Sequence, residues 1–264
     1  MPSTAPVHLE VRSGVAHLTL DRPEASNGMN VEFLEALGAA IMTCHGDPRV
    51  RVVLLTGRGK NFCTGGDVHT FASKGEQMPD YLRVATALLQ NAVTGMMRLA
   101  APVIASVHGF AAGGGGFGLV CASDLVIAAD SAKFLAGATR VGMAPDAGVS
   151  VTLPRLVGLR RAAEIILTNP IITAAEARDL GIVNRVVPAA DLERASLAWA
   201  AELATGAPKA LAAAKRLLWS GVGTGIDACL SEEARTVSEL SGTADAREGL
   251  AAVIERRKPV FTGR

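Results

Sequence analysis

The first 190 residues alternate short apolar runs with longer stretches in which apolar residues repeat at helical spacing. Val7–Glu10 and Val15–Leu20 carry alternating apolar positions on either side of Arg12–Gly14, which predicts a β-hairpin. Apolar residues then recur at helical spacing from Asn30 to about Cys44, and Asn30 is well suited to cap a helix. The chain therefore opens as strand, strand, helix.

The following stretches continue this alternation. They predict strands over Arg51–Thr56, Pro102–Val107, Asp124–Ala129 and Ile182–Val187, and helices over Tyr81–Leu99, Pro154–Leu167 and a short segment that opens with a capping box at Thr173. Phe71–Asp80 is polar and contains glycine, so it predicts a loop or a mobile flap. Strands that alternate with helices predict an α/β fold, although periodicity alone does not choose between a doubly wound sheet and other arrangements.

The composition changes at Asp191. From there to Arg257 the chain is rich in alanine, leucine, lysine and glutamate at helical spacing. We therefore divide the protein into a core over residues 1–190 and a helical C-terminal region over residues 191–264.

Composition narrows the functional class. The chain has 264 residues, 49% of them hydrophobic, and a formal net charge of +1 with both signs interspersed. This balance disfavours a broad nucleic-acid or membrane-surface footprint. Its 4 cysteines form no closely spaced pair, so neither a metal site nor a disulfide framework is expected. The chain also has no signal peptide and no apolar run of about 18 residues, which predicts a cytoplasmic protein.

Two glycine-containing segments follow apolar strands. One is the run Gly113–Gly116, and the other is Asn61–Asp67, which reads NFCTGGD. Glycine allows a ligand to approach the backbone closely, and the start of a helix offers N–H groups without acceptors. Such segments suit an anion or an oxygen that becomes one. Tight helix packing is the alternative explanation for a glycine run.

These segments resemble the enoyl-CoA hydratase/isomerase (crotonase) superfamily. The matching motifs are LTLDRPEASNGMN, NFCTGGD, VHGFAAGGGGFGLVCASDLVIAADSAKF, VGMAPDAGVSVTLPRLVGLRRA and LTNPIITAAEARDLGIVNRVV, followed by the closing DAREGLAAVIERRKPVFTGR. The resemblance implies a spiral of ββα units whose C-terminal helices cover the active site and build a homotrimer or a hexamer. It also implies an acyl-CoA thioester as substrate, in fatty acid metabolism, with coenzyme A as part of the substrate and no separate cofactor.

The resemblance further implies an oxyanion hole. Its two donors would be the amides of Thr64 and Gly115, which stabilise the enolate oxygen of the thioester. Counting forward from His108 gives Gly114 instead of Gly115, because the glycine loop holds one extra residue relative to the family. We favour Gly115, which follows from counting back from Asp124.

The chain departs from the hydratases of this family at both acid–base positions. Gly118, or Phe117 in the other register, stands where the first glutamate is expected, and Ala138 stands at the second. One carboxylate remains nearby, Asp146 in VGMAPDAGVS, where some isomerases of the family carry their base. Asp146 could alternatively cap the following helix.

A wider set of substrate contacts is implied by the resemblance. These residues are Arg22, Asn27, Gly65, Asp67, Gly114, Gly118, Ala138 and Lys258. Lys258 would touch the nucleotide of a neighbouring subunit. Asp67 is also suited to a turn or a helix cap.

A single aspartate supports a 1,3-proton shift, so we expect a Δ3-Δ2 enoyl-CoA isomerase. The alternatives are an enoyl-CoA hydratase, another acyl-CoA lyase, hydrolase or dehalogenase, and a catalytically silent acyl-CoA-binding or RNA-binding relative. A dehalogenase is disfavoured because the expected histidine region reads Leu88-Leu89-Gln90-Asn91 and the expected tryptophan position is Ala138. The near-neutral charge disfavours RNA.

Overall fold

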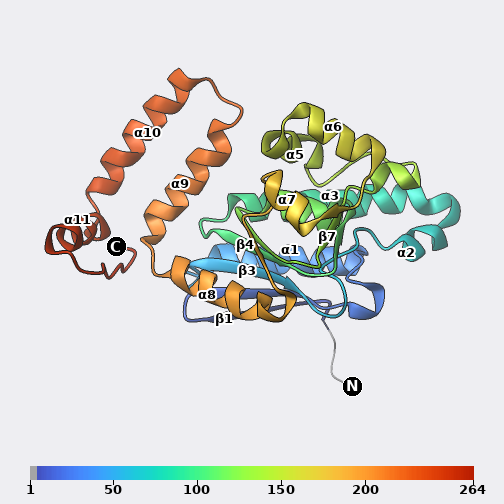
Figure 1. The fold of residues 1–264 in the computed structure, drawn as a ribbon, viewed down its shortest axis with the longest axis horizontal. Helices are drawn as coiled ribbons and strands as arrows, with labels where there is room; N and C mark the ends of the chain where they lie inside the picture. The colour runs from blue at the N-terminus through green and yellow to red at the C-terminus, as the bar shows by residue number, and fades with distance from the viewer. Residues whose placement is uncertain (1–4) are drawn as a thin grey trace.

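Two β-sheets form the framework of the protein (Figure 1). The computed structural model describes residues 5–264. The larger sheet has the strand order β1-β2-β3-β4-β6-β9 and the smaller one β5-β7-β8. The strands are β1 (Val7–Arg12), β2 (Val15–Leu20), β3 (Val52–Gly57), β4 (Val103–Val107), β5 (Phe110–Ala112), β6 (Leu125–Ala129), β7 (Lys133–Leu135), β8 (Ile172–Thr173) and β9 (Arg185–Val187). Pairing is antiparallel for β1–β2 and β7–β8 and parallel elsewhere.

Helices connect the strands and build the C-terminal region. They are α1 (Val31–Gly46), α2 (Val68–Ser73), α3 (Met78–Arg98), α4 (Leu119–Ala122), α5 (Val149–Val157), α6 (Leu159–Thr168), α7 (Ala174–Asp179), α8 (Leu192–Ala204), α9 (Pro208–Gly221), α10 (Ile226–Ser241) and α11 (Ala244–Glu255). Two predicted caps are confirmed. The Asn30 side chain accepts a hydrogen bond from the Phe33 amide, and Thr173 and Glu176 form a capping box.

The chain winds between the two sheets as a spiral. Strand β4 lies in the large sheet and β5 in the small one before α4 begins, and β6 and β7 repeat this step before α5 and α6. Single bridges, Met29 with Gly66 and Cys63 with Ala111, continue the small layer through the earlier turns. The predicted spiral of ββα units is confirmed.

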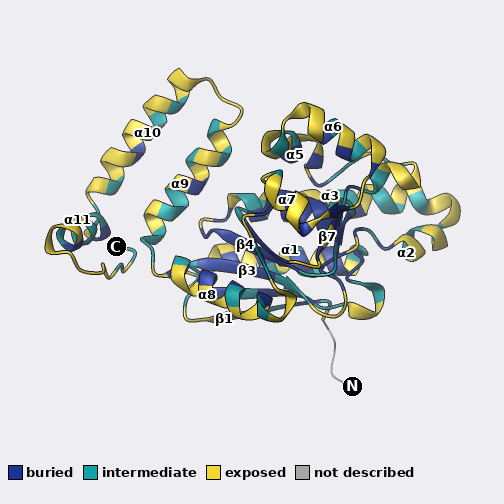
Figure 2. Ribbon diagram, viewed as in Figure 1, coloured by how far each residue is buried: buried dark blue, intermediate teal, exposed yellow. Residues whose placement is uncertain are grey.

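The core lies between the sheets and the helices packed on them (Figure 2). Every residue of β4 is buried, as expected for a central parallel strand covered on both faces. Helix α8 packs against β2, β3, β4 and β6 and buries Trp199 and Ala200. The division at residues 190 and 191 stays a prediction, but by packing α8 belongs to the core.

The segment predicted as a loop over Phe71–Asp80 is instead largely helical. Helix α2 occupies its beginning, a 3-10 turn over Gly75–Gln77 follows, and α3 begins at Met78. The Asp67 side chain caps α2 by accepting hydrogen bonds from the His69 and Thr70 amides. The prediction was wrong because the Asp67 cap stabilises a helix despite the polar residues that follow it.

Helices α9–α11 form an arm that projects from the body (Figure 1). Lys215 of α9 is buried, and its Nζ lies 2.7 Å from Asp124 Oδ2. The same ammonium group donates to the carbonyls of Met96 and Ala101. On the other carboxylate oxygen, Trp219 Nε1 donates to Asp124 Oδ1 at 2.7 Å. This ionic cluster joins the C-terminal half of α9 to the start of β6.

Replacing Trp219 by phenylalanine tests this anchor. The variant keeps an aromatic ring but loses a hydrogen bond to a charged group, which is worth about 1.5–3 kcal/mol. We expect urea unfolding to show a loss of that size and hydrogen exchange to show faster opening of α9. Ser220→Ala, at an exposed neighbour on α9, should change stability by less than about 0.5 kcal/mol. Equal stability of the two variants would contradict the anchor.

Within residues 5–264, no helix has both the length and the apolar character needed to cross a membrane.

Candidate active site

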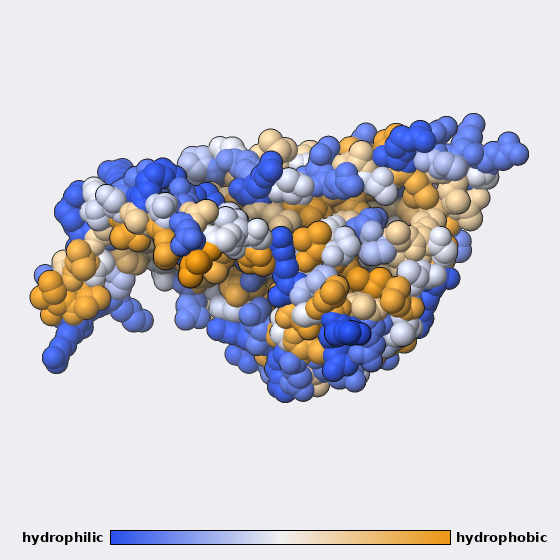
Figure 3. Space-filling view, turned by 90° about the horizontal axis from the view of Figure 1, so that it is seen from above, coloured by the Kyte–Doolittle hydropathy of each residue, from blue (hydrophilic) through white to orange (hydrophobic). Residues whose placement is uncertain are grey.

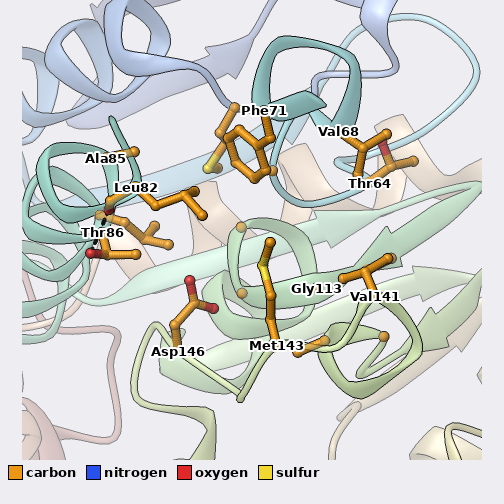
Figure 4. Close-up of a pocket in the computed structure, with 18 of the residues that line it drawn as sticks. Thr64, Val68, Phe71, Leu82, Ala85, Thr86, Gly113, Val141, Met143 and Asp146 are labelled. Atoms are coloured by element: carbon orange, nitrogen blue, oxygen red, sulfur yellow. Dashed lines mark hydrogen bonds between the residues drawn. The ribbon is translucent and has the colours of Figure 1, made fainter. Parts of the chain in front are cut away.

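A pocket of about 590 Å³ lies between two walls (Figure 4). One wall comes from α2 and the start of α3, including Phe71 and Leu82, and the other comes from the glycine run and the loop that carries Met143 and Asp146. The lining is mostly apolar. Among the described residues that line it, Arg140 and Asp146 carry the charged side chains.

Asp146 points its carboxylate into this pocket (Figure 4). Burial raises the pKa of this carboxyl above its ordinary value, and a hydrogen bond from its own backbone N–H opposes that effect. The side chain does not cap α5, because the N-cap residue is Gly148 and no side chain caps that helix. The alternative explanation of Asp146 as a cap therefore fails.

Gly114 lies directly against the Asp146 carboxylate. A Cβ atom built on Gly114 would be 1.5 Å from Asp146 Oδ1 and 2.4 Å from its Cγ. No side chain fits there while the carboxylate keeps its place. Gly114 therefore makes room for the acid of the pocket.

The glycine run forms a π-helical turn, Gly114–Gly118, that leads into α4. A π-turn holds one more residue per hydrogen-bonded ring than an α-turn does, so it accommodates the extra residue noted in the sequence. Neither Phe117 nor Gly118 lines the pocket, and both are buried. Gly118 is thus placed as a packing residue and not as a substrate contact, whereas Ala138 does line the pocket.

Thr64 lines the pocket, but its amide already has an acceptor within the protein. It donates to the Ser26 carbonyl at 3.2 Å, a bond that competes with the predicted role of this amide in the oxyanion hole. Gly66, two residues later, also lines the pocket. Within residues 5–264, its amide donates to no protein acceptor.

Gly115 brings a second amide to the same place. It belongs to the first turn of the π-helix, where N–H groups have no acceptor within the helix. A Cβ on Gly115 would lie 3.2 Å from the carbonyl carbon of Gly65, the atom bonded to the Gly66 nitrogen. The Gly66 and Gly115 peptides are therefore neighbours at the pocket wall.

Gly65 has a backbone role in this arrangement. Its φ of +96° suits glycine, and a Cβ there would lie 3.0 Å from the Ala112 carbonyl oxygen. The residue lets the NFCTGGD segment pack tightly on the glycine run. Sequence analysis predicted that these two segments meet, and the structure brings them together.

Arg22, Asn27 and Asp67 form structural contacts beside the pocket. Arg22 Nη1 lies 2.7 Å from Asp67 Oδ2. Although burial alone would raise it, hydrogen bonds from Thr70 and Arg22 lower the pKa of Asp67 to about 2. The Asn27 side chain is fully buried and donates to the carbonyls of Arg58, Asn61 and Phe62. Asn27 is therefore corrected from a substrate contact to a loop anchor.

The remaining predicted residues lie away from this pocket. Lys258 is exposed on the segment after α11, on the projecting arm. His108, which precedes the glycine run, has its Nε2 atom 3.0 Å from the Gly59 carbonyl oxygen, a contact within the fold. Throughout the described range 5–264, no three His, Cys, Asp or Glu side chains gather closely enough to hold a metal ion.

Comparison with known proteins agrees with this architecture. A family model described as enoyl-CoA hydratase/isomerase matches residues 10–264. A Rhodobacter capsulatus protein named probable enoyl-CoA hydratase is 40% identical over 258 residues, 98% of each chain. A Streptococcus mutans protein named trans-2-decenoyl-[acyl-carrier-protein] isomerase is 33% identical over 256 residues, covering 96% of this chain and 97% of its own.

Solved structures agree as well. The crystal structure of an enoyl-CoA hydratase from Polaromonas sp. JS666 superposes with a TM-score of 0.92 at 31% identity, covering 97% of this chain and 99% of that one. The spiral of ββα units is therefore the crotonase fold. With a family model that spans nearly its whole length and relatives of 40% and 33% identity, this chain belongs to the enoyl-CoA hydratase/isomerase family.

Proposed function

We propose that the protein is a Δ3-Δ2 enoyl-CoA isomerase in which Asp146 is the base. One observation carries this proposal. Among the described residues that line the pocket, Asp146 is the single side chain able to exchange a proton near neutral pH, because Arg140 stays protonated and the threonine hydroxyls are too weakly acidic. A pocket with one acid–base group suits a reaction that removes and returns one proton.

The reaction follows from this geometry. The Asp146 carboxylate takes a proton from C2 of a 3-enoyl thioester, and the electrons move into a dienolate whose oxygen becomes negative. The same carboxyl then returns the proton at C4, which leaves the double bond between C2 and C3. Atoms and charge balance without another reactant. Coenzyme A is the thiol part of the substrate, and the scheme needs no separate cofactor.

Two backbone amides supply the stabilisation that the dienolate requires. The Gly66 and Gly115 peptides are neighbours on the pocket wall, and Gly115 starts a helix whose dipole favours negative charge. Fixed amide donors act without rearrangement as charge develops on the thioester oxygen. We therefore propose Gly66 in place of Thr64 as the partner of Gly115.

The relative from Streptococcus mutans supports an isomerase, since its name describes one that acts on a thioester of acyl carrier protein. Hydratase names among the other relatives keep hydration as the second candidate. Adding water across a double bond needs a group that positions the water as well as an acid for carbon. The pocket lining offers one such group.

A substrate panel separates the two reactions. We expect turnover of 3-enoyl-CoA to 2-enoyl-CoA and little hydration of 2-enoyl-CoA, both followed by chromatography of the thioesters. The rate should fall at acidic pH, with a midpoint above the ordinary aspartate value of 3.8, because burial raises the pKa of Asp146 and the base must be ionised. Faster hydration than isomerisation would favour the hydratase.

We further propose that the arm mediates assembly into a homotrimer or a dimer of trimers. Apolar side chains are exposed along α9–α11, and hydrophobic surface is visible on the arm as well as on the body (Figure 3). They are Leu218, Ile226, Leu230, Val237, Leu250, Val253 and Ile254. Exposed apolar side chains in this number are what an interface between subunits would cover.

Sedimentation equilibrium tests the proposed assembly. We expect a mass of three or six chains of 27.2 kDa at micromolar concentration. The double variant Val253→Glu/Ile254→Glu, at two strongly exposed sites of α11, should shift the distribution toward the monomer with little change in the circular dichroism of the helices. A stable monomer in the unaltered protein would contradict this assembly.

A further inference from the structure

Ala147 adopts a backbone conformation that its side chain disfavours. Its φ is +51°, in the left-handed region, where a residue with a Cβ is strained. The neighbouring Gly148 is also left-handed, so the chain turns sharply just after Asp146. Strain at one residue persists only where surrounding contacts hold it, and such positions concentrate at active sites.

The contact that holds Ala147 is with Gly118. Ala147 is buried, and a Cβ on Gly118 would lie 2.6 Å from the Ala147 methyl carbon. The next atoms that this Cβ would meet are Val149 Cγ2 at 3.4 Å and the Ala147 carbonyl oxygen at 3.6 Å, which are ordinary contacts. The Ala147 methyl group therefore rests on the bare backbone of Gly118.

The same π-turn also contacts the acid itself. Gly114, at the other end of the turn, lies against the Asp146 carboxylate. The neighbouring residues Asp146 and Ala147 therefore contact the two ends of the same π-turn. Gly114 limits how far the carboxylate can approach the helix, and Gly118 fixes the backbone that follows it. Two contacts determine the direction of the side chain better than one.

We infer that Ala147 and Gly118 are positioning residues, whose contact aims the Asp146 carboxylate at the reacting carbons. This inference rests on the proposed role of Asp146 as the base. Neither residue lines the pocket, so neither touches the substrate. Their effect passes through the left-handed turn at Ala147, which the methyl group of that residue holds against the π-helix.

An exchange of the methyl group between the two positions tests this inference. Gly118→Ala forces two carbon atoms to within 2.6 Å, so the loop must move and carry Asp146 with it. We expect kcat for isomerisation to fall by about 10²-fold, as for a reacting group displaced by about 1 Å. KM should change little, because the pocket walls keep their residues.

The double variant Gly118→Ala/Ala147→Gly removes the clash. The new methyl at 118 then meets only the two ordinary contacts, and glycine at 147 adopts the left-handed conformation freely. We expect kcat to rise roughly tenfold or more above that of Gly118→Ala alone, the scale of coupling between residues in contact. Gly38→Ala, a helical glycine with no neighbour within 4 Å of its added Cβ, should leave kcat and KM unchanged.

The outcomes separate this inference from the proposed function. If Asp146→Asn retains full activity, the role of the base is wrong, whatever the exchange shows. If Asp146→Asn is inactive but Gly118→Ala keeps a normal kcat, positioning through Ala147 is wrong and the base stands. Equal losses in Gly118→Ala and in the double variant also contradict positioning by this contact. Thermal melts of each variant exclude loss of the fold as the cause.

Discussion

Asp146→Asn should lower the rate of 3-enoyl-CoA isomerisation by roughly 10²–10⁴-fold, the usual contribution of a positioned acid–base group. Asparagine keeps the shape of aspartate but accepts no proton from carbon. Substrate affinity should stay near that of the unaltered protein, because the apolar walls and the backbone amides are unchanged. Single-turnover assays together with binding of a saturated acyl-CoA measure both quantities.

The stability of the same variant provides an independent readout. A raised pKa in the folded state means that the fold binds a proton at Asp146 more tightly than the unfolded chain does, so the ionised carboxylate destabilises the fold at neutral pH. We expect Asp146→Asn to melt at a higher temperature at pH 7. The difference should vanish below the ordinary carboxyl pKa of 3.8, where the carboxyl is protonated in both states.

Asp146→Glu serves as the matched control, since it retains a carboxylate but extends it by one methylene toward the opposite wall. It should recover part of the activity lost in the asparagine variant. Full activity in folded Asp146→Asn would leave no pocket-lining group within residues 5–264 to act as base. The proposed role of Asp146 as the base would then be wrong. A silent acyl-CoA-binding protein would be favoured only if the unaltered protein itself showed no turnover.

Removal of a single backbone N–H should produce the second large effect. Replacing Gly66 or Gly115 by glycolate turns one amide into an ester and adds no side chain. The absence of a side chain matters because an added Cβ would clash at both positions. At Gly115 it would lie 2.8 Å from Met29 Sδ, and at Gly66 it would lie 2.4 Å from the Phe71 ring. Each ester should lower kcat by about 10²–10³-fold, or about 2.7–4 kcal/mol, as expected for one oxyanion donor.

The matched control is the same replacement at Thr64. Its amide donates to the Ser26 carbonyl, so the ester should cost about 0.5–1.5 kcal/mol of stability and leave kcat nearly unchanged. A large loss of kcat at Thr64 with none at Gly66 would restore the original assignment of the donor. Comparable losses at Gly66 and Gly115 would support the pair proposed here.

Local signals predicted much of the fold. Asn30 and Thr173 cap their helices as expected, because a capping side chain acts within three residues of its own position. The helix at Val68–Ser73 was not predicted, although Asp67 is a comparable cap. The segment is short, and the polar residues that follow it are typical of a loop. The winding of strands between two sheets came from the family resemblance, because hydrophobic periodicity carries no information about it.

The site was predicted in part, and the limits have a physical cause. Asp146 could be predicted from sequence because its proposed role depends on the chemistry of its side chain. The direction of an amide N–H depends on backbone dihedrals, which the side-chain pattern does not encode, so Thr64 and Gly66 could not be told apart. The extra residue counted at Gly114 and Gly115 fits the π-turn that the structure shows there.

The anchor at Asp124 has a consequence for the order of folding. Its carboxylate also accepts a hydrogen bond from the Val103 amide, so the acceptor for Lys215 takes shape only when β4 and β6 come together. Trp219 of α9 lies 95 residues later in the chain than Asp124, and long-range contacts of this kind form late. Helix α9 therefore has no formed binding partner until β4 and β6 have paired in the central sheet. The exposed apolar side chains of the arm therefore reach a fixed orientation only in chains whose central sheet has already formed, and the proposed assembly would select such chains.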